Sequence, residues 1–139
     1  MTTPNKMIRG YHPSLVFLAN GLLSGYTNAA GAGTFDASAS FDGMRRAATN
    51  KRIDIIRLFQ MVDGGGGTTT VEVFRRRSGV NTLLGSVSLA SGGGAFATAT
   101  VTPASEALRE LQVGDLVVVH FVARQTTTAE HVTILVDFT

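Results

Sequence analysis

The sequence of 139 residues predicts an all-β protein. We expect an antiparallel β-sandwich of about eight strands, of jelly-roll or Greek-key type, with an extended N-terminal arm. Short segments with alternating apolar and polar residues recur along the chain, and glycine- and threonine-rich turns separate them. No segment has the length and apolar spacing of a long helix. The predicted organisation is an arm over residues 1–30 and one sandwich domain over residues 31–139.

Length and composition limit the possible classes of protein. A chain of this size can bury an ordinary core without covalent cross-links. The sequence has no cysteine, which excludes disulfides and thiolate metal sites. The longest apolar stretch near the start, Leu15–Ala19, is too short to span a bilayer or to act as a secretory signal. We therefore expect no membrane partner.

The N-terminal arm is expected to be extended because glycines recur between Asn20 and Gly33 too often for a helix. His12-Pro13 favours an extended backbone, and residues 14–18 have the composition of a short strand. The arm is nevertheless too apolar to remain in water. We expect it to pack on this protein or on a neighbour through its apolar side chains: Tyr11, Leu15, Phe17, Leu22, Leu23 and Tyr26.

The strands of the sandwich follow from the alternation pattern. Thr34–Phe41 alternates strictly and predicts a half-buried strand, whereas the polar and basic segment Gly43–Arg52 predicts a loop or one helical turn. Ile53–Val62 has apolar residues on both faces, which is typical of an inner strand. Further strands are predicted at Thr69–Arg76, Thr82–Leu89, Ala95–Thr102 and His131–Phe138.

The segment Leu111–Arg124 is predicted to be the central strand of the core. Both of its faces are apolar, so neighbouring elements must cover it on both sides. The preceding segment Pro103–Leu111 predicts a single helical turn, with Ser105 as its N-cap and Glu106 in the first turn.

The charges are unevenly distributed, although the net charge is only +2. Residues 44–80 carry eight basic side chains against three acidic ones, and no charged residue occurs between Ser78 and Ser105. A soluble monomer usually protects exposed strands with charges. The uncharged segment predicts either a hairpin with a small polar outer face or a contact between copies of the chain.

Catalytic and metal-binding patterns are weak. His120 lies in an apolar strand and is expected to be a hydrogen-bonded core residue. His131 adjoins Glu130, but no third convergent ligand is evident. The four glycines at 64–67 precede a strand rather than a helix with a Lys-Ser/Thr pair, so they do not indicate a phosphate-binding loop. We expect neither an enzyme nor a cofactor.

Two clusters of basic residues are candidates for partner binding. One contains Arg45, Arg46, Lys51, Arg52 and Arg57, and the other contains Arg75, Arg76 and Arg77. No aromatic residues lie among them, so the sequence does not favour stacking on a nucleic acid. The alternatives are solvated loops and docking on an acidic protein surface, of which we favour docking.

Residues 53–138 resemble the jelly-roll modules of tailed-bacteriophage virion proteins, and most closely the head decoration (cement) proteins. The resemblance lies in the segment NTLLGSVSL (residues 81–89) and in the pattern L-x-x-G-D (residues 111–115), which leads into a valine-rich strand. This pattern also occurs in carbohydrate-binding and tumour-necrosis-factor-like sandwiches.

The resemblance implies a small homotrimeric structural protein on the exterior of the virion. Its partner would be the major capsid protein, and it would stabilise the capsid by bridging neighbouring shell subunits. The expected contacts are the apolar residues of the arm and Arg45, Arg46, Arg52, Arg75, Arg76 and Arg77. The alternative implied is a carbohydrate-binding or fibre module that attaches a virion to a host surface.

Overall fold

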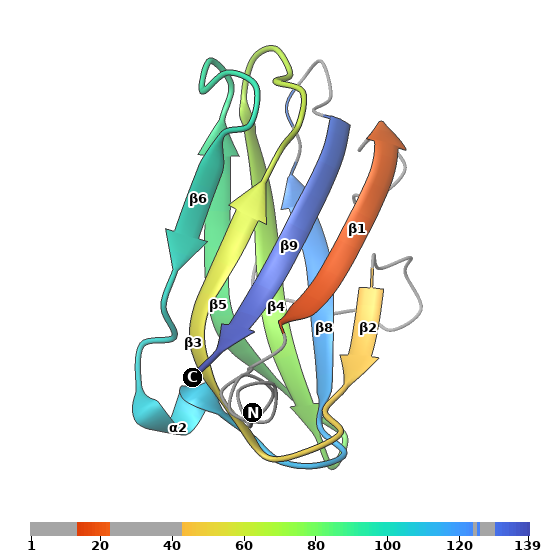
Figure 1. Ribbon diagram of the computed structural model, residues 1–139, viewed down its shortest axis with the longest axis vertical. Helices are drawn as coiled ribbons and strands as arrows, with labels where there is room; N and C mark the ends of the chain where they lie inside the picture. Colours follow the sequence, from red (N-terminus) through yellow and green to blue (C-terminus); the bar gives the residue numbers. More distant parts are fainter. Residues whose placement is uncertain (1–13, 23–42, 124, 126–129) are drawn as a thin grey trace, which may run out of the picture.

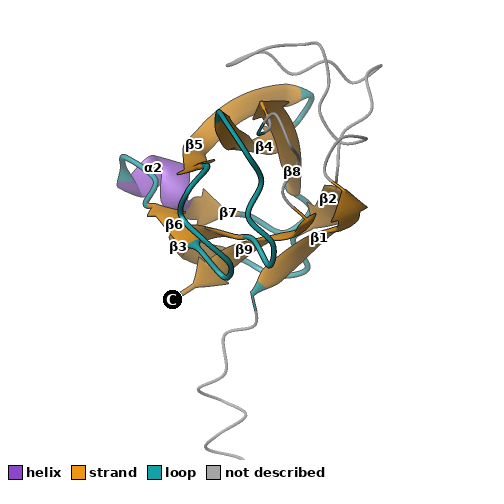
Figure 2. Cartoon of the chain, turned by 90° about the horizontal axis from the view of Figure 1, so that it is seen from above, coloured by secondary structure: helices purple, strands orange, loops and turns teal. Residues whose placement is uncertain are grey.

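The protein is an antiparallel β-sandwich, as the sequence predicts (Figure 1). The computed structural model describes residues 14–22, 43–123, 125 and 130–139. Two sheets face each other and enclose the core, and a view along the strands shows them as two layers (Figure 2). The predicted strand Thr34–Phe41 lies outside the described residues.

The first sheet has the order β1-β9-β3-β6. It consists of β1 (Leu15–Leu22), β9 (Glu130–Phe138), β3 (Lys51–Phe59) and β6 (Thr98–Val101). A short strand, β7 (Glu110–Leu111), pairs with the start of β3. Strands that are neighbours in this sheet are distant in sequence, so the chain must cross repeatedly between the two layers.

The second sheet has the order β2-β8-β4-β5. It consists of β2 (Gly43–Arg46), β8 (Leu116–Ala123), β4 (Thr68–Arg77) and β5 (Val80–Ala90). β4 and β5 form a hairpin through Ser78 and Gly79, whose φ angles are +50° and +80°. Positive φ at both central residues is typical of the tight turns that match the twist of paired strands.

The prediction that Leu111–Arg124 contains a central strand is confirmed by β8, which lies between β2 and β4. Val117, Val119 and Phe121 face the core between the sheets. Val118 and His120 alternate with them and are also buried, with 1% and 0% of their surface exposed. The His120 ring lies 6.3 Å from the ring of Phe74 on β4, between centroids. β8 is therefore buried on both faces.

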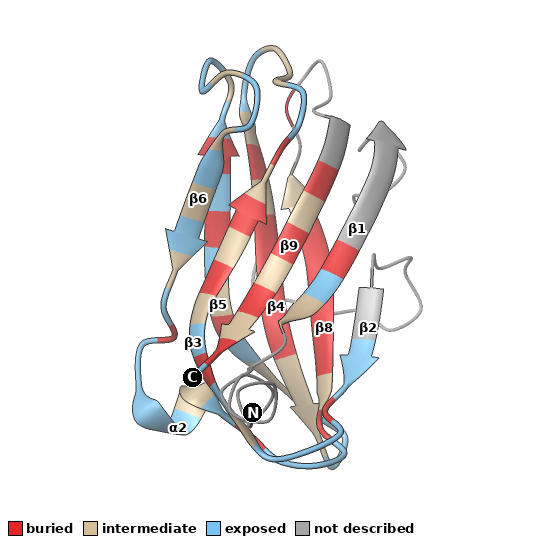
Figure 3. Cartoon of the chain, in the orientation of Figure 1, coloured by how far each residue is buried: buried red, intermediate tan, exposed pale blue. Residues whose placement is uncertain are grey.

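The core contains mainly β-branched and aromatic side chains at alternating strand positions (Figure 3). β9 contributes Val132, Ile134, Val136 and Phe138, which share one face as their spacing predicts. At Gly85 on β5, an added Cβ atom would lie 3.0 Å from Cγ1 of Val101 on β6. The absence of a side chain at this position lets the two strands approach closely.

The predicted helical turn is present as α2 (Glu106–Arg109). Oγ of its N-cap, Ser105, accepts a hydrogen bond of 3.3 Å from the backbone N–H of Leu108, which satisfies one of the open donors of the first turn. No helix in the described ranges is long and apolar enough to cross a membrane.

Several predicted element boundaries are wrong; the predicted strand Ile53–Val62, for example, is β3, which begins at Lys51 and ends at Phe59. Gly43–Arg46 is neither a loop nor a helical turn but strand β2, because it pairs with residues 116–119 of β8. β6 begins at Thr98 rather than at Ala95, because residues 91–97 form a turn in which Gly92, Gly94 and Phe96 have positive φ. Pairing with the distant strand β8 thus decides the conformation of Gly43–Arg46, whereas a local turn decides where β6 begins.

Candidate functional site

Three arginines predicted to bind a partner, Arg75, Arg76 and Arg77, form hydrogen bonds within the protein. Nη1 of Arg75 donates to the carbonyl oxygens of Ala107 (3.0 Å) and Glu110 (2.8 Å), at the C-terminal end of α2. A cation there satisfies carbonyls that the helix leaves open. Nη1 of Arg76 donates to Oδ1 of Asn81 across the β4–β5 turn, at 2.8 Å.

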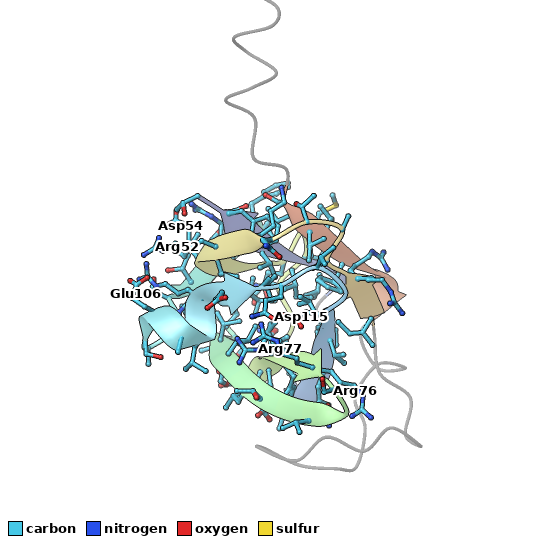
Figure 4. All side chains as sticks on the ribbon, turned by 90° about the horizontal axis from the view of Figure 1, so that it is seen from below. Arg52, Asp54, Arg76, Arg77, Glu106 and Asp115 are labelled. Atoms are coloured by element: carbon cyan, nitrogen blue, oxygen red, sulfur yellow. The ribbon has the colours of Figure 1, made fainter. Side chains whose placement is uncertain are left out.

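Arg77 forms a two-pronged ion pair with Asp115 (Figure 4). Nε donates to Oδ1 at 2.9 Å and Nη2 to Oδ2 at 2.7 Å. Only 3% of the Asp115 side chain is exposed. The hydrogen bond from Arg77 holds the pKa of Asp115 below its usual value, and it raises the pKa of Arg77. Both carboxylate oxygens of Asp115 accept hydrogen bonds from Arg77. The ion pair therefore holds the turn before β8 against β4.

Arg52 and Arg57 also have acidic partners. Arg52 lies against Glu106 at the start of α2, at 2.8 Å, and both side chains are largely exposed (Figure 4). Their hydrogen bond lowers the pKa of Glu106 and raises that of Arg52. Nε of Arg57 lies 2.7 Å from Oδ2 of Asp137, and Ser14 donates to the other oxygen of that carboxylate. Two of the five basic residues of the first cluster are therefore paired with carboxylates of the protein.

Arg45 and Arg46, on β2, are exposed. The guanidinium carbon of Arg45 lies 5.4 Å from the centroid of the Phe17 ring, a cation–π distance. Arg46 lines a pocket of about 260 Å³ together with Lys51, which we call the corner pocket. Its other lining residues are Ser14, Leu15, Ala47, Ala48, Thr49 and Phe138.

The predicted arm contacts have different locations. Phe17 is 1% exposed and belongs to the core, and Leu15 packs against that core from the same strand. Leu22 ends β1, where it pairs with Glu130 of β9. Tyr11, Leu23 and Tyr26 lie outside the described residues. Part of the predicted arm is thus the edge strand β1, which completes the first sheet by pairing with β9.

The uncharged segment between Ser78 and Ser105 forms one side of the sandwich, which we call the charge-free flank. β5 is the last strand of the second sheet and β6 the last strand of the first, and the two lie side by side (Figure 1). The exposed residues on these two strands are mostly small or hydroxylated: Val80, Leu83, Ser86, Ser88, Ala90, Thr98 and Thr100.

At one end of the flank, three exposed apolar residues form what we call the loop tip: Met61, Val62 and Phe96. Their exposed fractions are 49%, 42% and 75%. Phe96 has a φ angle of +60°, a left-handed conformation that is costly for an aromatic residue. Alternation rules place Phe96 in a strand, so the sequence did not reveal this feature.

A polar clamp holds the two loops of the tip together. Oδ2 of Asp63 accepts hydrogen bonds from the backbone N–H groups of Gly92 and Gly94, at 3.1 and 3.3 Å. Buried Gln60 donates through Nε2 to Oδ1 of Asp63 and to the carbonyl of Gly94. The phenyl group of Phe96 is therefore presented by a fixed backbone.

The histidines do not create a metal site within the part of the chain that the structure describes. No group of three or more His, Asp or Glu side chains there could hold a metal ion. His120 is fully buried, and burial lowers its pKa, which favours the neutral ring.

Comparisons with known proteins give a fold-level likeness only. No protein-family model matches the chain, and no curated protein matches it at a significant level. One similar solved structure is that of Eiger TNF from S. frugiperda, at 12% identity and a TM-score of 0.47. The likeness covers 91% of this chain and 94% of that one. At this identity and score, it carries no argument about function.

Proposed function

We propose that the protein is a structural virion protein that binds the outer surface of a phage capsid and stabilises it by bridging neighbouring shell subunits. The observation that supports this proposal best is the charge-free flank. Within the described residues, the two sheets end there in strands that pair on one side only, and neither strand carries a charged side chain. An open and uncharged edge is a poor surface for an isolated soluble domain, but it suits a contact with another protein chain.

Self-association through this flank would give the homotrimer that the sequence resemblance implies. The small side chains of β6, Thr98 and Thr100, allow a second backbone to approach closely. Hydrogen bonds to the edge of β6 would add to that contact. In a closed three-fold ring each copy contacts two neighbours through two complementary surfaces, and the flank offers two such surfaces, the edge of β5 and the edge of β6.

Docking on the shell would use the exposed cations of β2, Arg45 and Arg46, and the predicted arm contacts Tyr11, Leu23 and Tyr26. The partner is the major capsid protein, with an acidic surface that complements these cations. A protein that binds the assembled shell but not its free subunits stabilises the shell by mass action. A trimer with three docking surfaces strengthens the effect, because each bound copy raises the local concentration of the others.

The first test is the mass of the full chain in solution, measured by sedimentation velocity. We expect a trimer for the wild type. A double variant, Thr98→Lys with Thr100→Lys, adds charge to the flank and should sediment as a folded monomer. Val113→Lys is the control for an added lysine elsewhere, because Val113 is 64% exposed and lies between β7 and β8, outside the flank. Self-association through the flank is contradicted if the wild type sediments as a monomer. It is also contradicted if the double lysine variant still sediments as a trimer.

The second test is co-sedimentation with empty shells assembled from the major capsid protein encoded with this chain. We expect saturable binding that weakens in the variant Arg45→Gln with Arg46→Gln and at high salt. Absence of binding at micromolar concentrations of a trimer would overturn the decoration function while leaving the trimer intact.

A second candidate function is attachment of a virion to a host glycan, and the loop tip favours it. Phe96 is the most exposed aromatic side chain within the described residues. Its left-handed backbone conformation is costly, and so exposed a side chain offsets little of that cost by packing. An exposed ring on a rigid loop can stack on a sugar face. Binding to a glycan array that is lost in Phe96→Ser, with capsid binding absent, would support this function instead.

A further inference from the structure

The corner pocket contains cations without an acidic partner. Within the described residues, neither Arg46 nor Lys51 has a carboxylate within ion-pair distance. Most of the other described arginines are held by carboxylates, carbonyls or an amide of the protein. Lys51 has its ammonium 5.5 Å from the centroid of the Phe138 ring. Both cations lie beside a hollow rather than against an anion of the chain.

The remaining walls of the corner pocket are largely apolar. Leu15 comes from β1, Phe138 from β9, and Ala47 and Ala48 from the loop between β2 and β3. The pocket therefore lies where the two sheets meet, at the end of the sandwich that also carries α2 (Figure 1). Its volume of about 260 Å³ lies just below the range of drug-sized sites, which suits a single small apolar group.

The loop that forms one wall is held in place by the protein. The backbone N–H of Ala47 donates to the carbonyl of Asp115, and that of Gly114 donates to the carbonyl of Ala47, both at 2.8 Å. Oδ1 of Asn50 accepts a hydrogen bond from the backbone N–H of Val113 at 2.9 Å. A ligand would meet a wall that is already ordered, which reduces the entropic cost of binding.

A neighbouring hollow at the same end provides a contrast. It has a volume of about 290 Å³ and is lined by Arg52, Glu106, Ala107 and Glu110. Its cation, Arg52, already binds Glu106, and a second carboxylate, that of Glu110, lines the same hollow. The single cation that lines this hollow is therefore already paired, and an anion would gain no new ion pair by binding there.

We propose that the corner pocket binds a carboxylate that is attached to a small apolar group. The apolar group contacts Leu15, Ala47 and Phe138, and the carboxylate lies between Arg46 and Lys51. A guanidinium can donate two parallel hydrogen bonds to a carboxylate, and the ammonium adds a point charge. The carboxylate belongs either to a free organic acid or to the C-terminal residue of a peptide, and the chemistry is the same.

The test uses two pairs of probes and the full chain. 4-Phenylbutyrate represents the free acid and its primary amide is the neutral control. N-acetyl-Ala-Ala-Phe with a free carboxylate represents a chain end and its C-terminal amide is the control. Binding is followed by backbone amide shifts in ¹H–¹⁵N spectra. We expect at least one carboxylate to shift the amides of residues 46–51 in a saturable way, and its amide to bind at least tenfold more weakly.

Variants show whether the pocket itself is the site. Arg46→Gln and Lys51→Gln should each weaken binding by tenfold or more, and Ala48→Phe should abolish it by filling the space while both charges remain. Arg76→Gln is the matched control for loss of one positive charge, because Arg76 binds Asn81 away from the pocket. Urea midpoints close to that of the wild type would show that the variants fold.

Each outcome has a definite meaning. Binding of phenylbutyrate alone identifies a free acid as the ligand, and binding of the peptide alone identifies a chain end. Failure of both acids to bind at millimolar concentrations overturns the proposal, as does equal binding of the amides or of the Ala48→Phe variant. Because no probe is a capsid protein, these results do not depend on the proposed virion function.

Discussion

Arg77 on β4 forms an ion pair with Asp115 in the turn that leads into β8, the strand next to β4 in the second sheet. Both nitrogens of the Arg77 fork reach the carboxylate, at 2.9 and 2.7 Å. Oδ2 of Asp115 also accepts a hydrogen bond from the backbone N–H of Gln112 at 2.8 Å. The same turn is bonded to Ala47 in the wall of the corner pocket. The Arg77–Asp115 ion pair thus helps to hold the turn that contacts the wall of the corner pocket.

Removal of Arg77 should destabilise the protein markedly. In Arg77→Ala the nearly buried carboxylate of Asp115 loses its cation, and we expect the free energy of unfolding to fall by about 2–3 kcal/mol. Urea denaturation followed by circular dichroism measures this change. Arg52→Ala is the control, because its partner Glu106 is 75% exposed and the urea midpoint should hardly move. Equal effects of the two variants would contradict the structural role of Arg77.

The Arg77–Asp115 pair also predicts a loss of stability in acid. The pKa of Asp115 is lowered in the folded state, so the unfolded chain binds a proton more readily than the folded protein does. The stabilisation is complete above the unfolded pKa of about 3.9 and is lost as the pH falls below it. Urea midpoints measured between pH 5 and pH 2 in wild type and in Asp115→Asn test this. The wild type should lose more stability than the variant over that interval.

His120 predicts a second pH dependence, nearer neutrality. Burial lowers its pKa below the usual 6.5, so the folded protein resists protonation of a ring that the unfolded chain protonates readily. The sign follows from linkage: below pH 6.5 the unfolded state binds more protons, and the free energy of unfolding falls. A His120→Phe variant should lose this slope between pH 7 and pH 5. A slope that is unchanged in the variant would assign the effect to another group.

Gly85 should not tolerate even one methyl group without cost. In Gly85→Ala the new Cβ meets Cγ1 of Val101 at 3.0 Å, with Cδ1 of Ile56 also close, at 3.6 Å. We expect a loss of about 1–2 kcal/mol in the free energy of unfolding, because the strands must separate slightly. Ser86→Ala on the same strand is the control, since Ser86 is exposed. The double variant Gly85→Ala with Val101→Ala should recover part of the loss if this contact is its cause.

Local patterns in the sequence were sufficient for much of the sandwich. The alternation over Thr69–Arg76 and over His131–Phe138, and the run of apolar residues from Leu116, predicted β4, β9 and β8 to within a few residues. The Ser105 cap predicted α2. These features were accessible because side-chain periodicity and capping are local properties that depend on a few neighbouring residues.

Tertiary structure alone decided the roles of the charged residues. The sequence grouped Arg45, Arg46 and Arg52 with Arg75, Arg76 and Arg77 as docking residues, but the ion pair of Arg77 with Asp115 spans 38 positions and that of Arg52 with Glu106 spans 54. Which cation meets which anion depends on how distant strands pair, and sequence spacing contains no record of that pairing. For the same reason the sequence alone could reveal neither the core position of Phe17 nor the corner pocket beside Arg46 and Lys51, because each exists only where the two sheets meet.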